Sequence, residues 1–328
     1  MAGAVAGAPV AGADASARAR RGLIDVHHHI LPPGAPPPMA HLMAGWSAAG
    51  AVTDMDAAGI ATGIALPGLL LGADIQQNRA LARSWNEFGA QVGRDFPGRF
   101  GLFASLPLAD VEGSISEIDY AFDHLHADGC GIATNYGELW LGDARFWPIY
   151  EKLNDRKAVV FVHPADAPCC APAKMSYMAD GMDGSWIEWP MNTARTILSL
   201  LSSGALRKYP NIRFVFAHGG GVMPLLVNRI AGLSAWKHVG PEKLKAMFPD
   251  GVRAEFGRLH FECAQACSLT NMAALRSLVP DTNILFGSDY PIFPLAYGSG
   301  QFAKLDLPPT TRRMIGRTNA EALLPRWA

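Results

Sequence analysis

The chain has 328 residues, of which 49% are hydrophobic, and this excludes an intrinsically disordered protein. Its 28 lysines and arginines balance 29 aspartates and glutamates, so no basic face for nucleic acid is expected. The longest uncharged apolar stretch, Ala57–Ala73, falls short of the roughly 20 residues that span a bilayer, so no membrane partner is expected either. Five cysteines without a CxxC pair favour a reducing, cytoplasmic location over a disulfide framework.

The first 22 residues are rich in alanine and glycine and end in Arg18, Arg20 and Arg21. This places the charges after the apolar part, which is the reverse of a secretory signal peptide. We therefore expect residues 1–22 to form a flexible tail, with a processed leader as the alternative. Residues 23–328 are expected to form a single domain.

Short apolar runs alternate with segments of helix length along the rest of the chain. Eight runs are predicted to be strands, at residues 23–27, 60–66, 100–105, 130–134, 158–163, 212–217, 259–263 and 284–288. The segments between them include predicted helices at residues 75–96, 111–127, 192–208 and 225–236. Eight such repeats predict an α/β fold, a parallel (β/α)8 barrel of the TIM type, with the site at the carboxyl ends of its strands.

The first predicted strand ends in Asp25-Val26-His27-His28-His29. Because side chains two positions apart share one face of a strand, His27 and His29 are expected inside the barrel with Asp25 below them. His28 is then expected to face the surrounding helices. Two imidazoles at one strand end form half of a metal site, although a polar loop start is an equal reading of this pattern alone.

Three other predicted strands also end in one polar group, namely His163, His218 and Asp289. Each alone is more often a structural histidine or a capping aspartate, but all four ends meet at one rim of a barrel. We therefore predict a metal site formed by His27, His29, His163 and Asp289, which suits one Zn²⁺, with Mn²⁺ as the alternative. No lysine follows the fourth strand to bridge a second metal. His218 remains as an acid or base, because imidazole titrates near neutrality.

Together these strand ends resemble the amidohydrolase superfamily, a metal-dependent hydrolase type of barrel, and within it the branch of aminocarboxymuconate-semialdehyde decarboxylase and related non-oxidative decarboxylases. The resemblance extends from Leu23 onward, and its most specific segments are Met55–Ile60, Phe161–Pro164, His218–Ile230 and Ser288–Pro291. It implies the same four metal ligands and a catalytic His218. It also implies that Arg229 reaches the site of a neighbouring subunit, and hence a homodimer, although a tetramer stays open.

The chain departs from the muconate-type enzyme between Ile30 and Asp56, where it has no lysine or arginine to supply a second substrate-binding arginine. The aromatic and proline-rich residues there, with Trp46, suggest a compact aromatic acid with one carboxylate. The region through Leu106–Leu108 resembles the 6-methylsalicylate decarboxylases of the same branch. We therefore expect Trp46 and Arg229 to bind substrate, although Arg229 without the resemblance is an ordinary solvated helix charge.

The expected activity is that of a carbon-carbon lyase that removes CO₂ from a small hydroxylated aromatic acid such as 6-methylsalicylate. A bound metal would act as a Lewis acid, and either His218 or Asp289 would deliver a proton to the ring carbon. The same residues could instead serve a hydrolase that opens a lactone or an amide. A purely structural metal is the third reading, although structural zinc is usually closed by four ligands without a further histidine at the rim.

Overall fold

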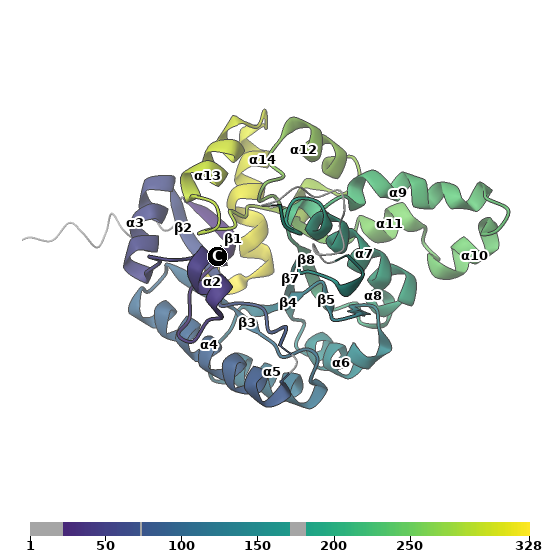
Figure 1. The fold of residues 1–328 in the computed structure, drawn as a ribbon. Helices are drawn as coiled ribbons and strands as arrows, with labels where there is room; N and C mark the ends of the chain where they lie inside the picture. Colours follow the sequence, from purple (N-terminus) through teal and green to yellow (C-terminus); the bar gives the residue numbers. More distant parts are fainter. Residues whose placement is uncertain (1–21, 73, 171–181) are drawn as a thin grey trace, which may run out of the picture.

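The computed structural model describes residues 22–72, 74–170 and 182–328 (Figure 1). The predicted tail therefore lies outside the described residues, apart from Gly22. Eight strands pair in parallel in the order β1-β2-β3-β4-β7-β8-β9-β10, and they form the predicted barrel. These strands are β1 (Leu23–His29), β2 (Ile60–Leu66), β3 (Phe100–Ser105), β4 (Gly129–Ala133), β7 (Val159–His163), β8 (Arg213–Phe216), β9 (His260–Glu262) and β10 (Ile284–Leu285).

Backbone hydrogen bonds between β1 and the chain after β10 close the barrel. The amide of Val26 donates to the carbonyl of Phe286 at 3.1 Å, and the amide of His29 donates to the carbonyl of Tyr290 at 2.7 Å. His28 and Tyr290 also form a parallel bridge. The first and last strands therefore hold each other in register beside the predicted site.

Helices surround the barrel, with α9, α10 and α11 extending to one side (Figure 1). The longer helices are α3 (Ala48–Ala58), α4 (Ile75–Asp95), α5 (Val111–Asp123), α6 (Trp147–Asp155), α7 (Glu188–Ser203), α9 (Met223–Gly232), α10 (Gly240–Met247), α12 (Leu269–Arg276) and α13 (Leu295–Lys304). The shorter ones are α2 (Pro37–Leu42), α8 (Ala205–Lys208), α11 (Val252–Phe256), α14 (Pro309–Arg313) and α15 (Asn319–Leu323).

The single helix predicted over residues 192–208 is two helices in the structure. Gly204 lies between α7 and α8 with a φ of 80°, a left-handed conformation that glycine adopts without a steric penalty. A short hairpin, β5 (Asn135–Tyr136) with β6 (Leu139–Trp140), was not predicted. Neither difference alters the order of the barrel strands.

Two groups of buried apolar side chains lie on the two faces of the strands. The group inside the barrel consists of Ile24, Val26, Ile64, Leu66, Phe103, Val159, Phe161, Val215, Ala217 and Leu285, with Ala320 and Leu324 from the C-terminal segment. A larger group packs between the strands and the helices. Because both faces of the strands are buried, the strands show no polar alternation. Polar residues at their carboxyl ends are therefore exceptions that need a partner or a role.

Within the described ranges, every helix is too short or too polar to cross a membrane.

Candidate metal-binding active site

The four predicted metal ligands lie together at the carboxyl end of the barrel. Nε2 of His27 is 3.1 Å from Nε2 of His29, and Oδ1 of Asp289 is 3.1 Å from each of these nitrogens. His163 completes the group, since one ligand atom from each of the four residues lies within 4.8 Å of the others. All four side chains are buried. The structure thus brings together residues that the sequence supplies from three separate strand ends.

The donor set fits a divalent cation. Nδ1 of His163 donates to the carbonyl of Pro164 at 2.7 Å, and this leaves Nε2 of the same ring as an acceptor for a metal. Three imidazole nitrogens and one carboxylate oxygen are ligands that Zn²⁺ and Mn²⁺ accept. The four residues therefore provide the ligand types and the proximity that a single metal ion requires.

The local electrostatics favour a positive charge on His27. Burial alone would lower the pKa of His27, but the carboxylates of Asp289 and Glu262 raise it to about 10. Burial alone would raise the pKa of Asp289, yet His27 and His29 hold it well below its ordinary value. The pKa of His163 is well below 6.5 because of burial and the neighbouring His29 and His27, which favours the neutral ring that a metal ligand requires.

Glu262 is a site residue that the sequence reasoning missed. It is completely buried at the end of β9, and its Oε1 accepts hydrogen bonds from Nδ1 of His27 at 2.8 Å and the amide of His218 at 2.7 Å. Its Oε2 accepts from the amide of Ala264 at 2.6 Å. A carboxylate on the second nitrogen of a metal-binding histidine fixes the orientation of the ring. A lone glutamate inside a predicted apolar strand was the available signal, because a buried carboxylate needs partners.

The prediction for Asp25 is wrong, because this residue does not lie beneath His27 and His29. The strand register shifts between Asp25 and His28, so the strict alternation assumed from the sequence is interrupted. Oδ2 of Asp25 instead accepts from Nδ1 of His28 at 3.0 Å and from the hydroxyl of Ser288 at 2.6 Å. Its Oδ1 accepts from the amides of His27 at 3.1 Å and Ser288 at 2.9 Å. Asp25 thereby ties the histidine end of β1 to the segment that carries Asp289.

A cavity of about 390 Å³ opens beside the predicted ligands, and both His218 and Asp289 line it. Nδ1 of His218 donates to the carbonyl of Ala264 at 3.3 Å, and its Nε2 has no hydrogen-bond partner among the described residues. Trp189 forms part of the wall, where its indole nitrogen donates to Asp166 at 2.7 Å. The rest of the described lining is mostly apolar or small, and it includes no lysine or arginine. The cavity therefore suits an apolar ring whose one charged group faces the ligand cluster.

Trp46 and Arg229, the two predicted substrate-binding residues, do not line this cavity in their own chain. The ring of Trp46 packs against Phe88 of α4, with centroids 6.2 Å apart. Arg229 is exposed on α9 and forms no ion pair with any described residue. An exposed Arg229 is compatible with the predicted contact to a neighbouring subunit, and both roles stay predictions.

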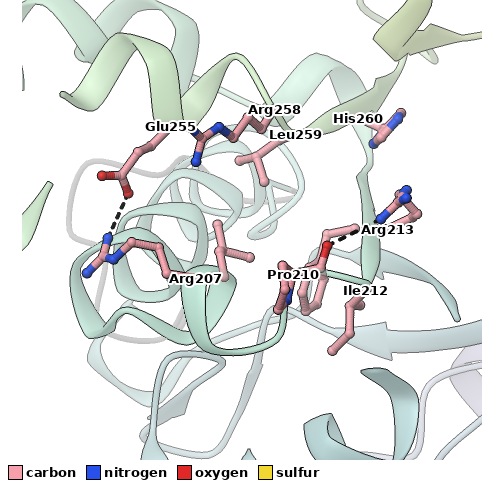
Figure 2. A pocket seen from close by; sticks show the side chains of 10 residues that line it. Arg207, Pro210, Ile212, Arg213, Glu255, Arg258, Leu259 and His260 are labelled. Atoms are coloured by element: carbon pink, nitrogen blue, oxygen red, sulfur yellow. Dashed lines mark hydrogen bonds and ion pairs between the residues drawn. The ribbon is translucent and has the colours of Figure 1, made fainter. Parts of the chain in front are cut away.

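A second cavity, of about 360 Å³, lies at the opposite end of the barrel, beside the first residues of β8 and β9 (Figure 2). Its charged groups are largely satisfied within the protein. Arg207 pairs with Glu255 at 2.8 Å, and Arg213 donates to the carbonyl of Pro210 at 3.3 Å. Because barrel enzymes place their chemistry at the carboxyl ends of the strands, this cavity is not the catalytic site.

Comparison with known proteins identifies the family of the chain. The family described as amidohydrolase matches residues 24–326. The chain is 32% identical over 293 residues to a decarboxylase of Aspergillus niger, an alignment that covers 83% of this chain and 78% of the relative. It is 30% identical over 320 residues to 6-methylsalicylic acid decarboxylase of Penicillium expansum, covering 92% of this chain and 96% of the relative.

A solved structure of similar fold is that of dihydroxybenzoic acid decarboxylase from Polaromonas, which contains manganese and the inhibitor 2-nitroresorcinol. The TM-score is 0.81 at 22% identity, and the match covers 93% of this chain and 97% of the other.

Proposed function

Because the chain belongs to the amidohydrolase family and is a metal-dependent decarboxylase of a small aromatic carboxylic acid, we propose that its substrate is a 2-hydroxybenzoate of the 6-methylsalicylate type. The observation that carries this proposal is the cavity lined by His218 and Asp289 and free of cationic side chains among its described residues. A substrate with one carboxylate and an apolar ring fits such a lining. A hydrolase that uses the same residues is not favoured, since the relatives are decarboxylases.

The chemical difficulty of the reaction is the electron pair that remains on the ring carbon when CO₂ leaves. If a proton first adds to this carbon, the dearomatised ring accepts the electrons of the breaking C–C bond. The overall change is that one proton replaces one CO₂, without oxidation or reduction. The enzyme therefore has to hold the ring in place and bring a proton to one carbon atom.

We assign the delivery of the proton to His218. Its Nδ1–H is held by the carbonyl of Ala264, so Nε2 is the atom that can carry a proton into the cavity. Asp289 is the second candidate, because its carboxylate also lines the cavity. An ion held by His27, His29, His163 and Asp289 would supply Lewis-acid stabilisation of the negatively charged oxygens of the substrate.

We further propose Zn²⁺ as the ion, with Mn²⁺ as the alternative. The nitrogen-rich donor set supports zinc, whereas the Polaromonas enzyme contains manganese. Metal analysis of the purified protein, together with removal by a chelator and reconstitution with each ion, decides between them. Activity restored by Mn²⁺ alone would overturn the assignment of zinc.

We also propose a cytoplasmic homodimer in which Arg229 of one subunit contacts the substrate in the other. The exposed guanidinium on α9, which forms no ion pair with a described residue, supports this role, since its planar donors suit a carboxylate. The test is to mix subunits that carry Arg229→Ala with subunits that carry His218→Ala. Each variant alone should be inactive. An equal mixture of the two should regain about a quarter of the wild-type activity, because half of its dimers are mixed and each mixed dimer contains one complete site out of two. No recovery in mixed dimers of proven composition contradicts the shared site.

The main experiment is a CO₂-release screen over substituted 2-hydroxybenzoates with the metal-loaded enzyme, combined with a hydrolysis assay on lactones. We expect CO₂ release from 6-methylsalicylate or a close analogue and no ring opening of the lactones. Lactone hydrolysis without CO₂ release would overturn the proposed function.

A further inference from the structure

Backbone conformation singles out one more residue in the cavity. Among the residues that the structure describes, five other than glycine have a positive φ, namely His126, Lys157, His218, Gln265 and Asp289. His218, Gln265 and Asp289 follow the neighbouring strands β8, β9 and β10, with φ values of 55°, 50° and 63°. All three line the same cavity. The other two lie at the opposite end of the barrel, just before β4 and β7.

A left-handed conformation is unfavourable for any residue with a Cβ atom, whereas glycine adopts it freely. Such residues cluster at functional sites when their side chains are needed there. His218 and Asp289 already have assigned roles, so Gln265 is the unassigned member of the set. Its neighbours Ala264 and Ala266 carry only methyl groups, so Gln265 supplies the polar side chain of this turn.

The hydrogen bonding of Gln265 fixes which way its amide points. Nε2 lies 3.3 Å from the carbonyl oxygen of Ser288. Because a carbonyl oxygen can only accept, the amide nitrogen has to face it and the amide oxygen has to face away. Within the described part of the chain, Oε1 has no hydrogen-bond donor. Gln265 therefore presents an anchored acceptor at the cavity that contains His218 and Asp289.

We propose that Gln265 determines substrate specificity, with its Oε1 accepting a hydrogen bond from a ring hydroxyl of the bound aromatic acid. This inference rests on the proposed function, since it takes a hydroxylated aromatic acid as the occupant of the cavity. We therefore expect Oε1 of Gln265 to favour binding of a hydroxybenzoate whose O–H group lies within its reach over binding of benzoate itself. Because Gln265 is exposed to solvent, we expect the preference to be about 3- to 10-fold, the range of one neutral hydrogen bond.

The test measures equilibrium binding of benzoate and of its 2-, 3- and 4-hydroxy isomers to the metal-loaded enzyme. Gln265→Met keeps the length of the side chain without its hydrogen bonds, and Gln265→Gly removes the side chain while accommodating the left-handed backbone. Lys157→Gly is the matched control, because Lys157 has a φ of 52° and is exposed at the opposite end of the barrel. Thermal unfolding of each variant is measured alongside.

We expect the wild type to bind one hydroxy isomer about 3- to 10-fold more tightly than benzoate. Both Gln265 variants should lose this preference while their affinity for benzoate is retained, and Lys157→Gly should behave as the wild type. An unchanged preference in a folded Gln265 variant overturns the inference. Equal weakening of all four ligands also overturns it, because that result assigns Gln265 to the support of the Ser288–Asp289 segment.

Failure of the proposed function gives a different result. The wild type would then release no CO₂ from any hydroxybenzoate and bind none of the four acids, and both proposals would fall together. CO₂ release by the wild type with an unchanged preference in the variants would overturn the role of Gln265 alone.

Discussion

Replacement of Glu262 by glutamine tests whether this residue orients the site. The two oxygens of Glu262 accept three hydrogen bonds, from His27, His218 and Ala264. A carboxamide has a single oxygen, so in Glu262→Gln at least one of these donors faces an NH₂ group. The loss of one hydrogen bond to a buried charged group corresponds to about 1.5–3 kcal/mol. Because His27 then loses its fixed orientation or its charge-assisted partner, we expect metal affinity to fall by about 10- to 100-fold.

Glu255 offers a matched control for this experiment. Its side chain is also almost completely buried and pairs with Arg207 at 2.8 Å, but it lies at the opposite end of the barrel. The assay is an equilibrium competition for Zn²⁺ and for Mn²⁺ against a chromophoric chelator, with unfolding of both metal-free variants measured in urea. We expect Glu255→Gln to lose stability and to bind metal as the wild type does. If Glu262→Gln binds metal within twofold of the wild type, Glu262 does not orient the site. If both variants lose metal affinity equally, the effect of Glu262→Gln is not specific to the site either.

Three further changes test other parts of the site and the fold. His218→Ala is expected to lower kcat by about 10²- to 10⁴-fold with its metal content unchanged, and a parallel loss of metal measured by mass spectrometry would contradict a role in proton transfer. Ser288→Ala removes the hydroxyl that donates to Asp25 at 2.6 Å, and it should lower the free energy of unfolding by about 1–3 kcal/mol, whereas an unchanged urea midpoint would show that this bond is dispensable. Burial and the nearby Arg213 lower the pKa of His260 from 6.5 to about 4. Between pH 6.5 and pH 4 the ring is therefore protonated in the unfolded chain and neutral in the folded protein. Wild-type stability should therefore fall relative to His260→Gln as the pH drops from 6.5 towards 4, and a constant difference over this range would count against the burial of the neutral ring.

The sequence was sufficient for the barrel because apolar runs mark strands that are buried on both faces. The predicted strands at residues 60–66 and 100–105 coincide with β2 and β3. The last predicted strand, 284–288, is shorter in the structure, because only Ile284 and Leu285 pair with β9, and the carbonyls of Phe286 and Tyr290 accept hydrogen bonds from the amides of Val26 and His29. Local periodicity does not report such tertiary hydrogen bonds, so strand ends were less predictable than the strands themselves.

The candidate ligands were predictable because each is the polar residue at the end of an apolar run. Glu262 and Asp25 were harder to assign, because their roles come from contacts with residues distant in the sequence. Glu262 meets His27 across 235 positions, and Asp25 meets Ser288 across 263. The register shift in β1 between Asp25 and His28 leaves no trace in the sequence pattern. The side chains that support the site therefore required the assembled barrel.

The separation between His29 and Asp289, which is 260 positions along the chain, affects when the centre can form during biosynthesis. A ribosome makes His27 and His29 near the start of translation and Asp289 only near its end. Until the last strand has emerged and packed against the first, the nascent chain lacks Asp289 at the candidate site, and the long segment between β1 and Asp289 has yet to be closed into a loop. Metal capture by these residues is therefore predicted to be a late event, coupled to closure of the barrel, and a product truncated before Asp289 would retain three of the four candidate donors without the carboxylate.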